Sequence, residues 1–260
     1  MSAEILVVRC GIIPYEEARE AQRRLAERRR REEIADVLLL LEHPPVYTRG
    51  RRSSAEELPM GDQWYEMQGI EVRDTDRGGR VTYHGPGQLV AYPILSLRPY
   101  DDDVLAYVRR LERVTIEALA EHGVEAGPIE GLTGVWTRGA TPPPGRRASN
   151  VQIADVSGPS TPEARKIGSI GVHVSRGVTT HGLAVNVSND LQPFEWIVPC
   201  GIEGVAMTSL SRELGAEQDL GAFADTVAAR FGAVYDRSPV VAEPADLGLD
   251  LPPATLGIPR

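Results

Sequence analysis

The sequence predicts a fold of the α/β (α+β) class, and three patterns support this expectation. A strand signal at residues 5–8 leads directly into a helical pattern. Short strand signals separated by glycine-rich turns dominate the chain after Gly69. Apolar residues recur at helical spacing over 104–123 and 220–234. Strands and helices should therefore pack around a hydrophobic core, for which the 42% hydrophobic content is ample.

In the first half of the chain, prolines mark where elements begin and end. Pro14 suits the first turn of a helix after the first strand, because its fixed backbone angle is already helical. Residues 37–41 are a continuous apolar run of strand length, closed by the proline pair at 44–45. This run predicts a buried strand that leads into a loop. The loop carries Arg49, Arg51 and Arg52.

In the second half, turn and cap residues separate the predicted elements. The aspartates at 101–103 offer an N-cap for the helix over 104–123. Residues 167–174 and 179–187 predict two strands joined by a turn at 176–177. The helix over 220–234 follows them.

Residues 1–236 are expected to form a single domain. Residues 138–165 are rich in Pro, Gly, Ser and Thr and predict an exposed insertion. Residues 237–260 have no clear period and predict a Pro-rich, loosely ordered tail. No run approaches the ~20 apolar residues that span a bilayer, and no basic leader precedes the first strand. A cytoplasmic location is therefore expected.

Charge and cysteine content narrow the classes of function. The formal net charge is −9, so the surface should repel nucleic acid and anionic membranes, and neither is expected as a partner. The two cysteines, Cys10 and Cys200, provide no disulfide framework. Cys10 lies in the first predicted strand and is interpreted as an inert core residue, since cysteine is among the most buried residue types.

The chain has 27 arginines and a single lysine, Lys166. A bias towards arginine fails where the cation must lose its proton, because a guanidinium stays charged whereas burial can neutralise an ammonium. In a strand that starts at Lys166 the residues of the same parity are apolar, so Lys166 should point inward or to a pocket rim. It is therefore a candidate proton acceptor or partner of a thiolate. The alternative is a solvated residue at the start of a strand.

Cys200 follows an apolar run and lies in a turn between Pro199 and Gly201 that can present its side chain at a pocket edge. The N–H of Gly201 is a candidate oxyanion donor. A thiol with the usual pKa of about 8.5 needs a nearby base or cation to react at pH 7, and Lys166 can supply either. This pair points to acyl transfer through a thioester. The alternative is an inert core cysteine.

The block over residues 77–88 concentrates glycines, polar groups and two arginines, as in loops whose backbone amides approach a ligand. It lacks the Gly-Lys-Ser/Thr ending of a phosphate-cradling loop, so nucleotide binding is not implied. An ordinary pair of hairpin turns is the alternative. Residues 181–184 offer small side chains on a strand where an alkyl chain can lie, or that simply packs closely. His84 and His181 lack the short spacing of metal ligands, so no metal is expected.

Taken together, these segments resemble the octanoyltransferase family, also called lipoyl(octanoyl) transferase or lipoate-protein ligase B. The resemblance covers about residues 4–235 and includes LLEHPPVYT, RGGRVTYHGPGQ, KIGSIG, HGLA and IVPCGI. It implies a mixed sheet with packed helices, similar to the catalytic domain of biotin and lipoate protein ligases. It also implies that no cofactor is used, because the substrate arrives as an activated thioester.

The resemblance implies transfer of an octanoyl group from octanoyl-acyl carrier protein to a lysine of a lipoyl domain, the first step of endogenous lipoate biosynthesis. Cys200 would be the acyl-thioester nucleophile and Lys166 its activator, with backbone amides near Gly171 and Gly201 stabilising the oxyanion. The acceptors would be lipoyl domains of 2-oxoacid dehydrogenases and the glycine cleavage H protein. The substrate pocket would be lined by Arg77, Gly78, Gly79, Arg80, Val81, Thr82, Tyr83, His84, Ser169, Ile170, Gly171, Gly182, Leu183 and Ala184.

Two features depart from the family pattern. The stretch between Trp136 and Lys166 is longer than usual, and Arg49 stands where an aliphatic residue is common. Neither touches the Cys200–Lys166 pair. The arginines near the predicted site are expected to steer two acidic partners towards an acidic enzyme; they are Arg49, Arg51, Arg52, Arg77 and Arg80.

Two alternatives remain open from the sequence. An ATP-dependent lipoate or biotin protein ligase on the same fold would have no use for Cys200, and an ATP requirement would distinguish it. A non-catalytic protein that binds acyl groups or docks carriers belongs to another class. Loss of either member of the pair would favour it, and both are present.

Overall fold

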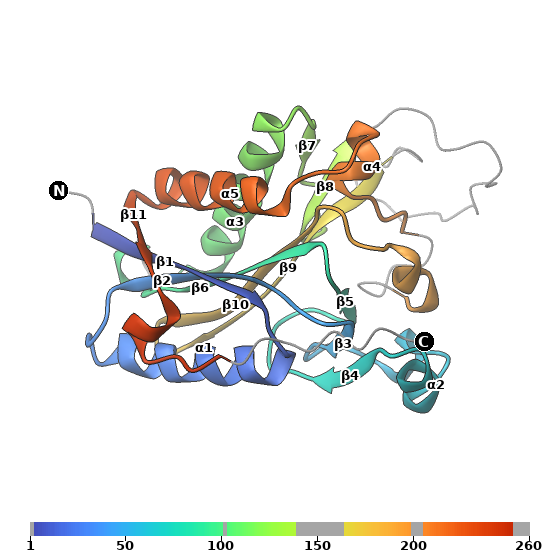
Figure 1. The fold of residues 1–260 in the computed structure, drawn as a ribbon, viewed down its shortest axis with the longest axis horizontal. Coiled ribbons are helices and arrows are strands. Elements are labelled where there is room, and N and C mark those ends of the chain that lie inside the picture. Colours follow the sequence, from blue (N-terminus) through green and yellow to red (C-terminus); the bar gives the residue numbers. More distant parts are fainter. Residues whose placement is uncertain (1–2, 101–102, 139–163, 199–204, 252–260) are drawn as a thin grey trace.

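A large mixed sheet forms the centre of the fold, and helices pack on both of its faces (Figure 1). The computed structural model describes residues 3–100, 103–138, 164–198 and 205–251. The α/β class with a mixed sheet and packed helices is confirmed. The strands are β1 (Ala3–Ile12), β2 (Asp36–Glu42), β3 (Val46–Arg49), β4 (Glu71–Asp74), β5 (Thr82–His84), β6 (Gln88–Ile94), β7 (Ala126–Gly127), β8 (Val135–Arg138), β9 (Ala164–Ser175), β10 (Val178–Asn186) and β11 (Arg237–Ala242).

Eight of these strands make the large sheet, in the order β11-β1-β2-β6-β10-β9-β8-β7, and β4-β3-β5 make a small one. In the large sheet β1 is parallel to β11 and β2, and the other neighbours are antiparallel. The helices and 3-10 turns are α1 (Tyr15–Arg30), α2 (Asp62–Met67), α3 (Val104–Glu121), α4 (Leu210–Leu214), α5 (Leu220–Tyr235), η1 (Ala55–Glu57), η2 (Arg98–Tyr100), η3 (Gln192–Trp196) and η5 (Pro244–Leu247). No described helix has the length and apolar character needed to cross a membrane.

The apolar run over residues 37–41 becomes β2, in the middle of the sheet. Leu38 and Leu40 pack on the side of α3 and α5, whereas Leu39 and Leu41 pack on the side of α1. A strand covered on both faces needs apolar residues at every position, which explains why the run does not alternate.

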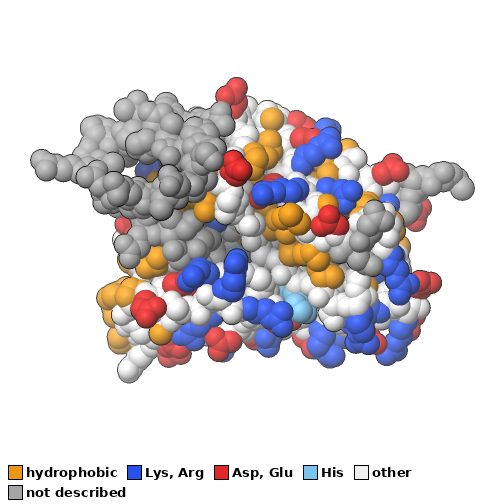
Figure 2. All heavy atoms as spheres, turned by 180° about the vertical axis from the view of Figure 1, so that it is seen from behind, with side chains coloured by type: hydrophobic (Ala, Val, Ile, Leu, Met, Phe, Trp, Pro, Cys, Tyr) orange, Lys and Arg blue, Asp and Glu red, His pale blue; other side chains and the backbone are white. Residues whose placement is uncertain are grey.

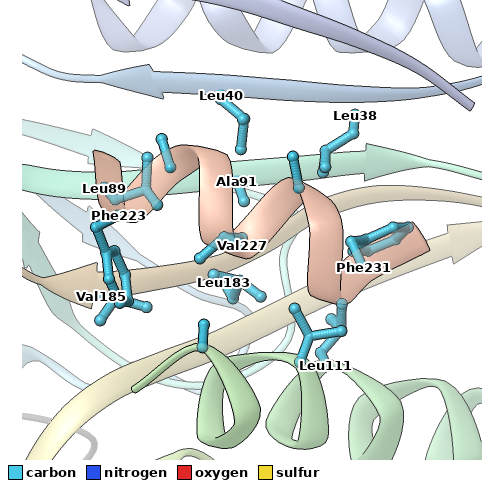
Figure 3. Packing of buried hydrophobic residues seen from close by; sticks show 14 of the residues in the cluster. Leu38, Leu40, Leu89, Ala91, Leu111, Leu183, Val185, Phe223, Val227 and Phe231 are labelled. Carbon is cyan, nitrogen blue, oxygen red and sulfur yellow. The ribbon is translucent and has the colours of Figure 1, made fainter. Parts of the chain in front are cut away.

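The helix over 220–234 is confirmed as α5, and its apolar stripe is the centre of the larger core. Phe223, Val227 and Phe231 lie on one face of α5 and pack onto β2, β6 and β10 (Figure 3). All three are fully buried, and burial of each such side chain contributes about 1.5–3 kcal/mol. The expected helix over 104–123 is α3, which Asp103 caps by accepting a 3.0 Å hydrogen bond from the Ala106 N–H.

The expectation of a loosely ordered tail from residue 237 is wrong up to residue 251. β11 adds to the edge of the sheet parallel to β1, and the Arg237 guanidinium donates to the buried Asp36 carboxylate at 3.1 Å. A Cβ at Gly232 of α5 would lie 2.7 Å from the Pro239 ring, so the tail packs closely on this helix. A proline is tolerated there because an edge strand has unpaired N–H positions. Residues 252–260 lie outside the described part of the chain.

Several short elements had no sequence prediction: β3, β4, β7, β8, α2 and α4. Strands of two to four residues are too short to show alternation, and one-turn helices too short to show a stripe. Arg49, expected in a loop, is the last residue of β3. The expected insertion lies outside the described residues except at its ends, where β8 finishes at Arg138 and β9 starts at Ala164.

Candidate active site

A cavity of about 480 Å³ lies where the two sheets meet. Its walls come from the first turns of α3, the middle of β9 and β10, and the loop between β4 and β5. This face of the molecule is visibly hollowed, with basic side chains along one border and hydrophobic ones along the opposite border (Figure 2). Most of the predicted site residues line this cavity: Lys166, Arg77, Gly78, Gly79, Arg80, Thr82, His84, Ser169, Ile170, Gly171, Gly182, Leu183 and Ala184.

Two predicted residues, Val81 and Tyr83, do not line the cavity. Successive side chains of a strand point to opposite faces, so Thr82 and His84 of β5 face the cavity while Tyr83 faces away. Tyr83 packs against Tyr47 and Phe194, in a core cluster that also contains Val81. Val81 and Tyr83 anchor the segment 77–88 in the core and are not part of the cavity wall.

Lys166 is 2% exposed and lies in the cavity wall near the start of β9. Its N–H donates to the Ala206 carbonyl at 2.8 Å, and its carbonyl accepts from the Thr208 N–H at 2.9 Å. The ammonium is 5.4 Å from the centre of the Trp136 ring. A Cβ at Gly134 would lie 2.9 Å from the Lys166 Cε, so a glycine there makes room for the side chain.

The inward orientation expected for Lys166 agrees with its burial, but strict alternation does not explain it. The register between β8 and β9 shifts at Val135 and Trp136, so one residue of β9, Ile167, has no partner opposite it. Such a bulge re-aims side chains locally. Sequence parity across residues 166–168 therefore does not assign them to faces.

A buried polar network holds the segment that follows position 204. Arg165 and Glu213 form a two-pronged ion pair at 2.7 and 2.9 Å, and the Thr208 hydroxyl donates to the same carboxylate. Burial acts to raise the pKa of Glu213, but the hydrogen bonds from Arg165 and Thr208 outweigh it and hold the pKa below its usual range. Asn186 of β10 also donates to the Thr208 carbonyl at 2.9 Å. Residues 206–208 are therefore fixed against Lys166.

Cys200 lies outside the described residues, as do Pro199 and Gly201. On its N-terminal side, the Val198 N–H donates to the Glu57 carbonyl at 3.0 Å. The buried Glu57 carboxylate accepts from the Val81 N–H at 3.1 Å and pairs with Arg80. Val198 is thus bonded to Glu57, whose carboxylate pairs with Arg80 of the cavity wall, and Ala206 is bonded to Lys166.

Arg77 shapes the opposite end of the cavity from Lys166 and is itself largely buried. It donates to the Thr48 carbonyl at 2.6 Å and to the Thr48 hydroxyl at 2.7 Å. The Gly78 N–H donates to the Val172 carbonyl of β9 at 2.8 Å. A Cβ at Gly171 would lie 2.9 Å from the Gly78 carbonyl oxygen, so only a glycine allows the loop to approach the strand this closely.

Three buried histidines stand near this end of the cavity. Burial lowers the pKa of His43 to about 4 and holds that of His84 well below its usual value. Burial also lowers the pKa of His181, although its hydrogen bond to Asp76 at 2.8 Å acts in the opposite direction. All three rings are therefore neutral at pH 7. No group of His, Cys, Asp and Glu that could hold a metal ion occurs within the described chain.

The other cysteine, Cys10, is a partly buried residue of β1 that packs against the core. Its thiol packs towards the α1 side of the sheet, and burial raises its pKa to about 12. A thiol with this pKa stays protonated at neutral pH and is a poor nucleophile.

Several residues of the cavity wall were not predicted from the sequence. Val104 and Val108 come from α3, whose exposed first turn gave no sequence signal of a ligand. Tyr92 and His181 come from β6 and β10, and Arg52 from the loop after β3. The remaining omitted residues of the wall are Tyr15, Gly131, Leu132, Thr133 and Val172.

Sequences of known proteins match most of this chain. The model of the lipoyl protein ligase A/B catalytic domain matches residues 14–232. An octanoyltransferase of Chloroflexus aggregans is 44% identical over 91% of this chain and 97% of its own length, and one of Salinispora tropica is 47% identical over 82% and 87%. An octanoyltransferase of Myxococcus xanthus is 42% identical over 92% of this chain, which spans 62% of that relative's length.

Solved structures share the fold at much lower identity. A bi-partite lipoate protein ligase of Thermoplasma acidophilum has a TM-score of 0.67 at 14% identity, over 93% of this chain and 87% of that one. Lipoate-protein ligase A bound with ATP has a TM-score of 0.63 at 16% identity, over 94% of this chain and 89% of that one. At this identity the likeness supports the fold alone.

Proposed function

This chain belongs to the lipoyl protein ligase A/B catalytic-domain family, and we propose that it is an octanoyltransferase that acts through a thioester on Cys200. The octanoyl group arrives on acyl carrier protein and leaves on a lysine of a lipoyl domain, without a nucleotide. The observation that carries the proposal is Lys166, the single lysine of the chain, buried in the wall of a cavity that most predicted substrate-binding residues share.

The chain on either side of Cys200 supports its pairing with Lys166. Val198, two residues before it, is bonded to Glu57 beside the Arg80 wall, and Ala206, six residues after it, is bonded to Lys166 itself. Both anchors are backbone hydrogen bonds, which do not depend on side-chain rotamers. A thiol between them is proposed to lie within reach of the Lys166 amine.

In the first half-reaction, the Lys166 amine takes the proton of the Cys200 thiol. The thiolate attacks the carbonyl carbon of the octanoyl thioester, so that a new C–S bond forms and the bond to the carrier sulfur breaks. The carrier leaves as a thiolate and takes the proton from Lys166. No oxidation or reduction occurs, and the energy of one thioester is kept in another.

In the second half-reaction, the neutral amine of the target lysine attacks the carbonyl carbon of the enzyme thioester. A C–N bond forms, the bond to Cys200 breaks, and the proton lost from the amine passes through Lys166 to the departing sulfur. Water would compete with the amine in an open site. The buried apolar residues of the wall, among them Leu183 and Ala184, limit that competition.

In this proposal the Gly171 amide is not the oxyanion donor. Gly171 lies five residues along β9 from Lys166, roughly 16 Å in an extended strand. It pairs with Gly182 on β10, and both glycines line the cavity. We therefore assign Gly171 to the acyl tail, and the Gly201 N–H remains the proposed donor to the oxyanion.

The acceptor and donor proteins belong to this proposal as well. The Thermoplasma acidophilum ligase of the same fold has an E2 lipoyl domain as its partner in an archaeal lipoylation system, which supports a lipoyl domain as the acceptor here. Lipoyl domains of 2-oxoacid dehydrogenases and the glycine cleavage H protein are the proposed acceptors, and the cytoplasm the proposed location. The competing function is an ATP-dependent ligase.

Intact-protein mass spectrometry tests the proposal directly. Octanoyl-acyl carrier protein is mixed with the enzyme without ATP, alongside Cys200→Ser and Lys166→Arg. We expect an octanoyl adduct on the wild type, no thioester on Cys200→Ser, and slow formation on Lys166→Arg. If the wild type gains no adduct, and ATP with free octanoate gives an acylated lipoyl domain, the ligase function replaces the transferase.

A further inference from the structure

The charge of the cavity wall differs from that of the whole chain. The chain carries a net charge of −9, yet the described lining residues include four basic side chains, Arg52, Arg77, Arg80 and Lys166, and no Asp or Glu. An octanoyl chain is uncharged and needs none of them. The concentration of positive charge therefore points to an anionic part of the substrate.

Three of the four basic side chains already have a role or a partner. Lys166 is assigned to the chemistry, Arg77 donates to Thr48, and Arg80 pairs with the Glu57 carboxylate. Arg52 differs from them, because its side chain is exposed and forms no ion pair with any described residue. Its neighbour Arg51 is likewise exposed and has no such pair within the described ranges.

The backbone that carries these two arginines is held firmly. The Arg51 N–H donates to the Arg77 carbonyl and the Arg52 N–H to the Gly79 carbonyl, each at 3.0 Å. A Cβ at Gly50 would lie 2.5 Å from the Gly79 carbonyl oxygen, so the turn fits here only with glycine. The arginines are thus presented from a fixed turn at the mouth, which lowers the entropic cost of binding.

We propose that Arg52, assisted by Arg51, binds the phosphate of the phosphopantetheine arm on which the acyl group is delivered. A guanidinium offers parallel N–H donors that match two phosphate oxygens, and a charged acceptor makes these bonds stronger than neutral ones. The proposal rests on the proposed function, since it assumes a carrier-bound acyl donor. It adds a recognition site for the part of the donor that is neither acyl chain nor protein.

The test is a binding experiment that needs no turnover. Two unreactive thioethers, S-octyl-4′-phosphopantetheine and S-octyl-pantetheine, differ only in the phosphate. Their dissociation constants are measured by calorimetry on the wild type, on Arg52→Gln, and on Arg23→Gln as a matched control. Arg23 is an exposed arginine of α1 that pairs with Glu20 and does not line the cavity.

We expect the wild type and Arg23→Gln to bind the phosphorylated thioether about tenfold or more tightly, the size of one charge-assisted contact, and Arg52→Gln to lose most of this preference. Equal affinity of the wild type for both thioethers would overturn the proposal. So would an Arg52→Gln variant that weakens both equally, or displacement of both by ATP at lower concentration, which would assign the anion site to a nucleotide. The binding experiment involves no acyl transfer. It therefore tests the phosphate site even if the thioester mechanism is wrong.

Discussion

The two ends of the cavity are built by different means. At one end Lys166 is held by backbone hydrogen bonds to Ala206 and Thr208. At the other end Arg77 is bonded to Thr48, and the surrounding histidines are neutral because they are buried. In the proposed function, the Lys166 end performs the chemistry and the Arg77 end shapes the binding wall. Variants at the Lys166 end should therefore change kcat, whereas variants at the Arg77 end should change stability and KM.

The largest effect is expected at the Lys166 end. Lys166→Arg keeps the charge but cannot exchange a proton near neutral pH, so kcat should fall about 10²–10⁴-fold with little change in KM. Steady-state transfer to a lipoyl domain measures both constants. Arg113→Lys, on the exposed face of α3, is the control and should retain full activity. A Lys166→Arg enzyme with unchanged kcat, and an unchanged urea midpoint, would remove Lys166 from the mechanism.

At the other end, the effect of His43 should appear as pH-dependent stability and not as chemistry. The folded-state pKa of His43 is about 4 against a usual 6.5, so the unfolded chain binds more protons between these values. Stability should therefore fall as the pH drops from 6.5 to 4, by about 3 kcal/mol for this group at ~1.4 kcal/mol per pH unit. Urea unfolding at pH 7, 5.5 and 4.5 should show a shallower pH slope for His43→Gln. An identical slope in the variant would contradict a neutral buried imidazole.

A smaller loss of stability is expected when Arg77 loses its acceptor. Thr48→Val removes the hydroxyl that accepts from Arg77 and leaves a buried guanidinium partly unsatisfied, which should cost about 1–3 kcal/mol. KM for the acyl donor should rise, because the Gly78–Gly79 loop is tied to this side chain. Thr226→Val, at a partly buried threonine of α5 that does not line the cavity, serves as the matched substitution. A drop in kcat without a change in KM would contradict the assignment of substrate binding to this end of the cavity.

The smallest effect is expected at Cys10. Burial raises the pKa of this thiol to about 12, so it should neither react with thiol reagents at pH 7 in the folded protein nor contribute to transfer. Cys10→Ala should therefore keep the activity and the number of rapidly labelled thiols of the wild type. Loss of a rapidly labelled thiol in Cys10→Ala would mean that the reactive cysteine has been misassigned.

Long elements with a clear period could be predicted from the sequence, and short ones could not. β2, α3 and α5 were predicted because each buries many residues whose spacing records which faces are covered. β11 was not predicted because it depends on tertiary contacts. It pairs with β1 across more than two hundred residues, and Pro239 packs on Gly232. No local pattern in a proline-containing tail reveals them.

The candidate site was also predicted only in part, because some of its residues depend on tertiary structure. Arg77, Lys166 and Gly182 stood out because their residue types are unusual in context, and the structure brings them to one cavity. Tyr83 was assigned to the pocket with its neighbours because a sequence block does not show which residues of a strand face which side. Val104 and Val108 reach the cavity through the placement of α3 against the sheets, which is a property of the fold and not of the helix sequence.

The most direct test of the account is a chase of the isolated octanoyl-enzyme. The enzyme is loaded from octanoyl-acyl carrier protein, freed of donor, and mixed with apo lipoyl domain while both masses are followed in time. We expect the adduct to leave Cys200 and to appear on the lipoyl-domain lysine at the same rate and in equal amount, as fast as steady-state turnover. An adduct that persists while the lipoyl domain is octanoylated only when fresh donor is present would contradict a thioester intermediate.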